Sequence, residues 1–178
     1  ILEGPGARIY GPNAFAGAIN FITNESKTDN ISLSLNAGQY NSFSGTLSTS
    51  FSFENFSNFL TVSKKVSDGY ISNTDFDIEN FYYQANIDLS KINVFAFAGL
   101  SDKKFGANSF YTPKFPDQYE ILNTLFAGLK TETGRIFKVT TSFYWRRNQD
   151  IFQLFRETES WYNFDGRYFI NGSDTAKY

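Results

Sequence analysis

The sequence predicts an all-β protein: an antiparallel, up-and-down sheet of about seven strands that forms part of a larger transmembrane β-barrel. Three observations predict it. Residue types alternate with a period of two along most of the chain. The connections between the alternating stretches are short and long in turn. Aromatic residues make up 19% of the chain and gather on one side of the alternation, opposite Ser, Thr and Asn. Strands with lipid on one side and a polar lumen on the other have this pattern.

The amino-acid composition argues against several classes of function. The chain has 178 residues, enough to bury one sizeable core, and a formal net charge of -2, which argues against a nucleic-acid partner. It contains neither His nor Cys, so it lacks the commonest general base, thiol nucleophiles and zinc-thiolate ligands. Its hydroxyl groups are spread along the strands and are not gathered beside a base. We therefore predict that the protein is not an enzyme.

The strands follow from the alternation. It is strongest over residues 43–53, where Phe43, Leu47 and Phe51 face one way and an unbroken row of Ser and Thr faces the other. In three later stretches both faces carry apolar residues. No regular element is predicted from Asn148 onward. In chain order, the predicted strands cover residues 31–38, 43–53, 56–66, 80–89, 91–104, 120–130 and 134–147.

The connections support an up-and-down order. Those after the second, fourth and sixth strands are tight, and those after the third and fifth are long, with the sequences VSDGYISNTDFDIE and KFGANSFYTPKFPDQYE. Short turns at one rim and long loops at the other are typical of bacterial outer-membrane barrels. A soluble sandwich or lectin also alternates and also has uneven loops. Long strands, the hydroxyl row and aromatics at strand ends favour the membrane.

The opening segment carries a family resemblance. Glycine and proline are dense in LEGPGARIYGPNAFAGAINFITN, residues 2–24, which then turns apolar. This stretch resembles the end of the plug domain of TonB-dependent outer-membrane receptors, where a V-L-[RE]-G-P…Y-G…G-x-I-N-I-I-T pattern is typical. Glu3 stands where many members have Arg. The matching plug-motif positions are Gly4, Pro5, Tyr10, Gly11, Gly17, Ile19 and Asn20.

The resemblance implies a domain division, a location and partners. Residues 1–27 would be the C-terminal end of the plug, and residues 28–178 the first part of the barrel with its extracellular loops. Such receptors lie in the bacterial outer membrane and close a 22-stranded barrel around the plug. They import a scarce small-molecule nutrient with energy delivered by TonB, here through a TonB box outside this sequence. Outer-membrane lipids are further partners, and a surface lipoprotein is a candidate.

Four aspartates suggest a cargo. Asp75 and Asp77 stand two residues apart before the fourth predicted strand, Asp68 opens the same loop, and Asp102 ends the next strand. In an up-and-down sheet all four come to the same rim, where converging carboxylates suit a structural Ca²⁺ ion. Asp75-Phe76-Asp77 resembles the D-x-D of cobalamin receptors of this family, which order their loops with Ca²⁺. Acidic residues that only solvate a loop are the alternative.

Aromatic residues in the long loop 105–119 form a second candidate site. Phe110, Tyr111 and Tyr119 could stack on a flat or sugar-like ligand, or pack the loop against its neighbour. Cobalamin uptake is the first expectation for function, and ferric-siderophore uptake by the same architecture is the second. A soluble secreted β-domain that binds glycans is the alternative from a different class.

Overall fold

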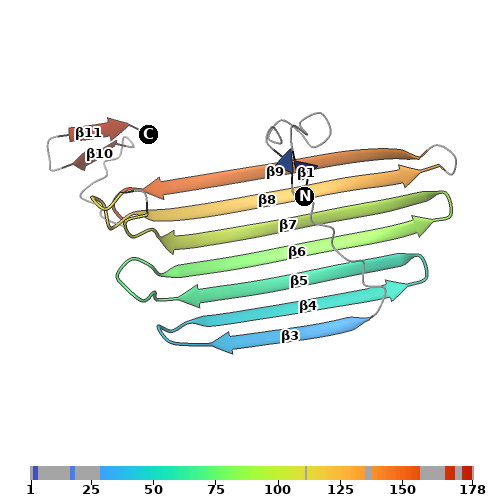
Figure 1. Cartoon of the computed structure of the whole chain (residues 1–178), viewed down its shortest axis with the longest axis horizontal. Helices are drawn as coiled ribbons and strands as arrows, with labels where there is room; N and C mark the ends of the chain where they lie inside the picture. Colours follow the sequence, from blue (N-terminus) through green and yellow to red (C-terminus); the bar gives the residue numbers. More distant parts are fainter. Residues whose placement is uncertain are drawn as a thin grey trace.

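The main body of the protein is a single seven-stranded antiparallel sheet in which each strand pairs with its neighbours in sequence (Figure 1). The structure, a computed structural model, describes residues 29–110, 112–134 and 138–156, and the backbone of two short strand pairs. Within these residues there is no helix, and hence none that is long and apolar enough to cross a membrane. The strands of the sheet are β3 (Asn30–Ala37), β4 (Phe43–Phe53), β5 (Phe56–Ser67), β6 (Phe76–Leu89), β7 (Ile92–Gly106), β8 (Tyr119–Thr133) and β9 (Val139–Gln153).

The two ends of the sheet differ, as the sequence predicted. The connections 54–55, 90–91 and 134–138 lie at one end, which we call the turn end. The connections 38–42, 68–75 and 107–118 lie at the other, which we call the loop end (Figure 1). The predicted all-β, up-and-down arrangement is therefore confirmed, as an open sheet of seven strands.

Several predicted strand boundaries were wrong, most of all in β6, β8 and β9; β8 runs to Thr133 and not to residue 130. β6 begins at Phe76 and not at residue 80, and β9 covers Val139–Gln153 and not residues 134–147. The stretches that the prediction left out, residues 76–79 of β6 and 148–153 of β9, contain polar residues that interrupt the alternation. Lys64 Nζ of β5 lies 3.3 Å from Asp77 Oδ1 and 2.6 Å from Glu79 Oε1. The added first residues of β6 are therefore held to β5 by ion pairs across the strands. β9 continues because β8 offers backbone partners as far as Tyr119.

Two short strand pairs lie outside the main sheet. β1 (Leu2–Glu3) pairs with β2 (Gly17–Ala18), and β10 (Arg167–Ile170) pairs with β11 (Asp174–Lys177). The second pair shows that the region after residue 148, predicted to be irregular, contains strand structure. Of the plug-motif residues, Gly17 lies in β2, opposite Glu3. The others fall outside the described residues: Gly4, Pro5, Tyr10, Gly11, Ile19 and Asn20.

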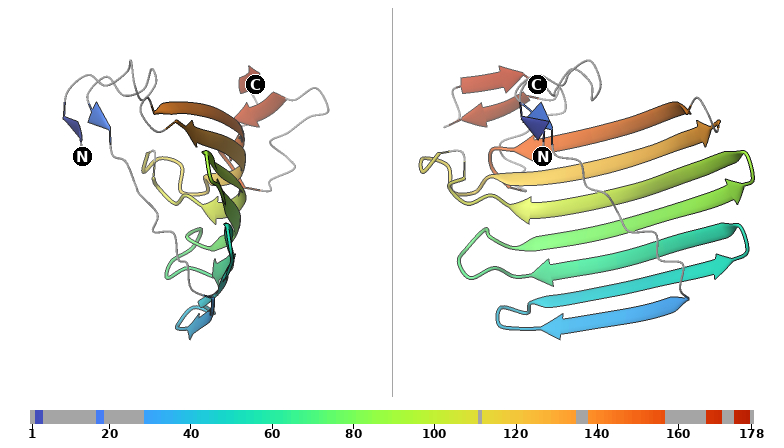
Figure 2. Two further views of the ribbon diagram at one scale, coloured as in Figure 1. Left: turned by 90° about the vertical axis from the view of Figure 1, so that its right-hand side faces the viewer. Right: turned by 45° about the vertical axis from the view of Figure 1, so that its right-hand side comes forward.

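The pairing register separates the sheet into two faces. The face that holds Leu33, Leu47 and Phe143, which we call the apolar face, carries nearly all of the exposed large hydrophobic side chains of the strands. The opposite face, which we call the polar face, carries the buried polar side chains of the strands, Ser50, Gln84, Asn86 and Glu120, whereas the buried Tyr119 at the start of β8 belongs to the apolar face. The sheet twists and curls, and neither layer nor helix covers it over the described residues (Figure 2). Side chains bury one another on a concave face, so this distribution is what a polar inner face would produce.

The polar face is divided into two halves. On β3, β4 and β5 it is lined by hydroxyl and amide groups, with Ser48 Oγ 2.9 Å from Thr61 Oγ1. On β5 to β9 it carries an aromatic ladder, a run of rings whose centroids lie 6.2–6.5 Å apart. In spatial order, the ladder consists of Phe59, Tyr82, Phe126, Phe97 and Tyr144. The uniform hydroxyl surface seen in the sequence of β4 therefore covers only part of this face.

Two glycines make room for the ladder. A Cβ atom at Gly99 would lie 2.4 Å from Cζ of Phe126, and one at Gly128 would lie 2.4 Å from Cζ of Phe97. Each ring thus occupies the space that a neighbouring side chain would fill. Close approach of this kind is a common reason for glycine inside a strand.

Candidate ligand site at the loop end of the sheet

Three segments that are distant in sequence meet at the loop end: residues 68–75, residues 107–118 apart from 111, and residues 154–156 after β9. Their backbones are joined directly. The amide N of Asn108 donates to the carbonyl O of Asn73 at 3.1 Å, and the amide N of Arg156 donates to the carbonyl O of Asp117 at 2.9 Å. The loops are therefore a connected structure and not three separate excursions of the chain.

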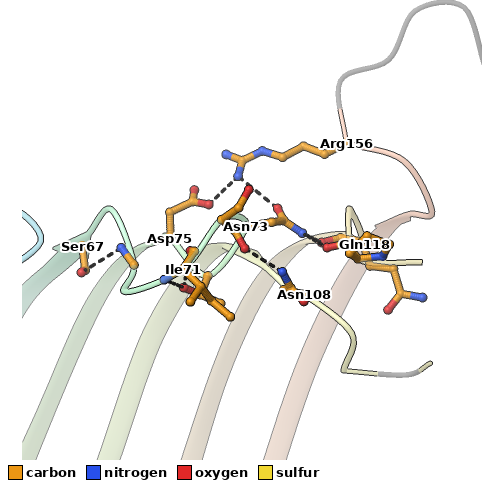
Figure 3. Close-up of polar contacts among 11 residues, drawn as sticks. Ser67, Ile71, Asn73, Asp75, Asn108, Gln118 and Arg156 are labelled. Atoms are coloured by element: carbon orange, nitrogen blue, oxygen red, sulfur yellow. Dashed lines mark hydrogen bonds and ion pairs between the residues drawn. The ribbon is translucent and has the colours of Figure 1, made fainter. Parts of the chain in front are cut away.

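Asn73 is the central residue of this structure. Its Nδ2 donates to the carbonyl oxygens of Pro116 at 2.8 Å and Gln118 at 2.7 Å (Figure 3). Its backbone has a φ of 56°, in the left-handed region that Asn tolerates better than most residues. A Cβ at Gly106 would come within 2.5 Å of the Asn73 carbonyl oxygen, so this crossing also requires a glycine. The amide of Asn73 thus holds the β7–β8 loop against the β5–β6 loop.

Arg156 forms the second tie. Its Nη1 donates to Asp75 Oδ1 at 2.5 Å and to Asn73 Oδ1 at 3.4 Å (Figure 3). Its guanidinium carbon lies 4.2 Å from the ring centroid of Tyr119, a cation–π contact. The side chains of Arg156 and Asp75 are only 29% and 30% exposed. We call Asn73, Asp75 and Arg156 together the rim clamp.

A pocket lies beside the rim clamp, on the polar face. Its volume is about 420 Å³. The register of β8 and β9 builds it, because Glu120 stands opposite Phe152 and both side chains belong to the polar face. Phe115 belongs to the lining and packs edge-on against Phe155, with ring centroids 5.6 Å apart. The rim pocket is lined by Thr112, Phe115, Gln118, Glu120, Asp150, Phe152 and Leu154.

The structure separates the predicted substrate contacts. Phe110 is 75% exposed in the β7–β8 loop and does not line the rim pocket. Tyr119 is 8% exposed, and its ring is covered by the Arg156 guanidinium. Tyr111 lies outside the described residues. The aromatic residues that do line the pocket, Phe115 and Phe152, were not among the predicted contacts.

The four predicted metal ligands have other partners. Asp68 accepts a hydrogen bond from Asn41 at 2.6 Å, and Asp75 is held by Arg156. Asp77 lies 3.3 Å from Lys64. Asp102 lies inside β7 and accepts a long hydrogen bond, 3.5 Å, from Asn123. Across the described part of the chain, no three acidic side chains are grouped to hold a metal ion. As placed, the aspartates do not form a calcium site.

Sequence reasoning missed the residues that organise this end of the sheet. Asn73 and Arg156 are 83 positions apart, and neither belongs to a motif or to an alternating stretch. Glu120 and Phe152 come together only through the register of β8 and β9. Comparison with known proteins adds nothing to these assignments, because no family model, curated protein or solved structure matches the chain.

Proposed function

We propose that the sheet is part of a transmembrane β-barrel, with its apolar face against lipid and its polar face toward the lumen. The exposed apolar face is the observation that supports this. Leu33 is 65% exposed, Phe143 67% and Trp145 46%, and comparable side chains lie on every strand of the sheet. The seven strands lie about 4.8 Å apart, so the band of exposed apolar side chains across them covers roughly 700 Å². Soluble monomers rarely leave an apolar patch of that size uncovered.

The dimensions of the band suit a bilayer. On β6 the apolar face runs from Phe81 to Leu89, about 26 Å at 3.3 Å per residue. Outer-membrane barrels have an apolar band of about 25 Å. Most ionisable side chains of this face lie just beyond it, toward the loop end: Lys64, Asp77, Glu79, Asp102 and Lys104. Arg147 lies in the row of Phe81, at the edge of the band. A boundary between acyl chains and headgroups at that level would explain the change.

We further propose that the protein is a TonB-dependent receptor of the bacterial outer membrane, which binds a scarce nutrient and imports it without covalent chemistry. The resemblance of residues 2–23 to the plug motif supports this class. A ligand pocket on the polar face at the loop end is consistent with capture from outside the cell. TonB and outer-membrane lipids would be its partners. Cobalamin is the first candidate cargo, a ferric siderophore the second.

Two adjacent positions of β9 test the membrane proposal. Trp145 belongs to the apolar face and Tyr144 to the polar face. In a Trp161→Phe background, the fluorescence of Trp145 should be quenched strongly by lipids brominated along their acyl chains. A single tryptophan placed at position 144 by Tyr144→Trp, with Trp145→Phe, should be quenched much less, because it faces the lumen.

The same pair of variants identifies the alternative. Equal quenching at the two positions would show that neither face is selectively lipid-facing. No quenching at either, with folded protein in detergent-free buffer, would favour a soluble glycan-binding β-domain.

Calorimetric titration of the whole protein in detergent with cyanocobalamin tests the cargo. Saturable binding is expected, and its absence would leave ferric siderophores as the next candidates. A second titration with a calcium chelator tests the calcium proposal separately. A loss of affinity on chelation would mean that the loops rearrange and release Asp75 from Arg156 and Asp77 from Lys64. Unchanged affinity would show that calcium is not involved.

A further inference from the structure

We propose that the polar face of the sheet binds a neutral oligosaccharide, which lies across the strands along the aromatic ladder. This inference goes beyond the proposed function, because it concerns the wall of the sheet and neither the rim pocket nor its cargo. It does not depend on what covers the apolar face. Three features carry it: a continuous row of hydroxyl and amide side chains, the rings beside that row, and the distribution of charge over the polar face.

One row of the pairing register has a hydroxyl or amide side chain on every strand of the sheet, and we call it the hydrogen-bonding row. Several neighbours in it are in direct contact. Asn80 Nδ2 donates to Ser63 Oγ at 3.2 Å, and Ser101 Oγ donates to Asn80 Oδ1 at 2.7 Å. An amide has two donor hydrogens and two acceptor lone pairs, so Asn80 keeps capacity for a ligand after both contacts. From β3 to β9 the row consists of Ser34, Thr46, Ser63, Asn80, Ser101, Thr124 and Asn148.

The aromatic ladder lies in the two rows next to the hydrogen-bonding row. Tyr82 follows Asn80 by two residues on β6, a separation of about 6.6 Å along the strand, and Phe126 follows Thr124 in the same way on β8. From β5 to β9 the ladder crosses roughly 19 Å of sheet. Four of its rings are half-buried and Tyr144 is 60% exposed, so part of the ring surface is accessible. This outline fits a long, narrow ligand.

The central part of the polar face carries little charge. In the hydrogen-bonding row and the two ladder rows of the described sheet, Arg146 is the one side chain that is charged at neutral pH. The other charged side chains of this face lie in the outer rows: Lys65, Lys103, Glu120 and Asp150 toward the loop end, and Asp88, Lys130 and Glu132 toward the turn end. Both outer groups contain both signs, so the face as a whole suits a ligand without net charge.

A sugar chain matches these three features. The C–H groups on the face of a pyranose ring can pack on an aromatic ring, and the hydroxyl groups at its edge form hydrogen bonds. A sugar that lies on the ladder would therefore place hydroxyl groups beside the hydrogen-bonding row. An apolar segment of protein in the same place would cover the hydroxyl and amide groups without hydrogen-bonding them, which costs free energy.

Four neutral pentasaccharides test the proposal: maltopentaose, cellopentaose, mannopentaose and xylopentaose. Their binding to the whole protein is measured by saturation-transfer difference NMR in a detergent without a sugar headgroup, with protein-free micelles as the blank. At least one of them should bind saturably, and more tightly than its disaccharide, because the longer chain contacts more rings. Its affinity should change by less than about twofold between low and high salt, because the contacts involve no net charge on the ligand.

Variants assign the binding to the ladder. Tyr144→Ala should weaken it about fivefold, the loss of one ring contact, whereas Tyr144→Phe should leave it nearly unchanged. Because Tyr144 is 60% exposed, neither change is expected to disturb the fold. Thr124→Val keeps the shape of the side chain but removes a hydroxyl from the hydrogen-bonding row, and it should weaken binding by a smaller factor. The matched control is Phe143→Ala, a similar truncation one residue away on the apolar face, which should leave the affinity unchanged.

The outcomes separate this inference from the proposed function. Binding of none of the four pentasaccharides would overturn it, and so would binding that Tyr144→Ala does not weaken, or that Phe143→Ala weakens equally. Alternating quenching along β9 would then still support the barrel. If the quenching fails instead and the protein folds without detergent, the same titrations in buffer decide the sugar site alone.

Discussion

The variant Phe143→Arg is expected to lower the free energy of unfolding by about 2–4 kcal/mol in lipid, the cost of an arginine near the middle of a bilayer on the outer face of a barrel. Phe143 is 67% exposed and stands opposite Leu129, at the centre of the apolar band. In water, the same replacement of an exposed side chain would cost little, because the guanidinium would be solvated. Urea titration of the protein folded into vesicles measures the difference.

The neighbouring residue provides the control for this variant. Ser142 lies on the polar face, at nearly the same depth. Ser142→Arg is expected to change the unfolding free energy by less than about 1 kcal/mol, since surface substitutions away from special features have small effects. Similar costs at the two positions would contradict the assignment of the apolar face to lipid.

The variant Gly99→Ala should destabilise the sheet by about 1–3 kcal/mol, the usual cost of forcing extra atoms into a packed site. The new methyl group would lie 2.4 Å from Cζ of Phe126 and 2.9 Å from the backbone oxygen of Phe81. The Phe126 ring can turn aside, but the backbone of β6 cannot move without disturbing its backbone hydrogen bonds with β7. The measurement is the midpoint of thermal or urea unfolding.

Two further variants make this test specific. At Gly45, the nearest atom to an added Cβ is Leu35 Cδ2, at 3.3 Å, the end of an exposed side chain that can give way. Gly45→Ala should therefore change stability by less than about 1 kcal/mol, helped by the smaller backbone entropy of alanine. Phe126→Leu should recover part of the loss in the Gly99→Ala background. A loss of the same size with and without the Phe126 ring would show that the ring is not the cause.

The sequence was most informative where one strand face is exposed to a different medium from the other. In residues 43–53 and 30–37 the alternation is nearly complete, and the predicted bounds agree with β4 and differ by one residue at each end of β3. Prediction failed where polar residues interrupt the alternation, as at Asp77 and Glu79, because their partner Lys64 belongs to another strand. Strand length there depends on pairing, which a local pattern does not contain.

The loop end was predictable in position but not in content. The length of the connections placed it correctly, since long loops follow every second strand (Figure 1). The aspartates were expected to converge, and Arg156 instead takes Asp75 while Lys64 approaches Asp77. Ion pairs across such distances follow from the fold, and a single sequence offers no covariation to reveal them. The aromatic ladder was missed for a similar reason: its rings come from five strands.

The rim clamp also bears on how the sheet folds. Each hairpin of the sheet joins residues that are close in sequence, so strands can be added one after another as the chain becomes available, with little loop-closure entropy to overcome. Arg156, by contrast, lies 81 positions after Asp75. Until β9 is paired with β8, Asp75 has no ion pair with Arg156. Because Arg156 follows β9, its tie to Asp75 requires that all the strands from β6 to β9 are paired in register, so the ion pair depends on the arrangement of more than half of the sheet.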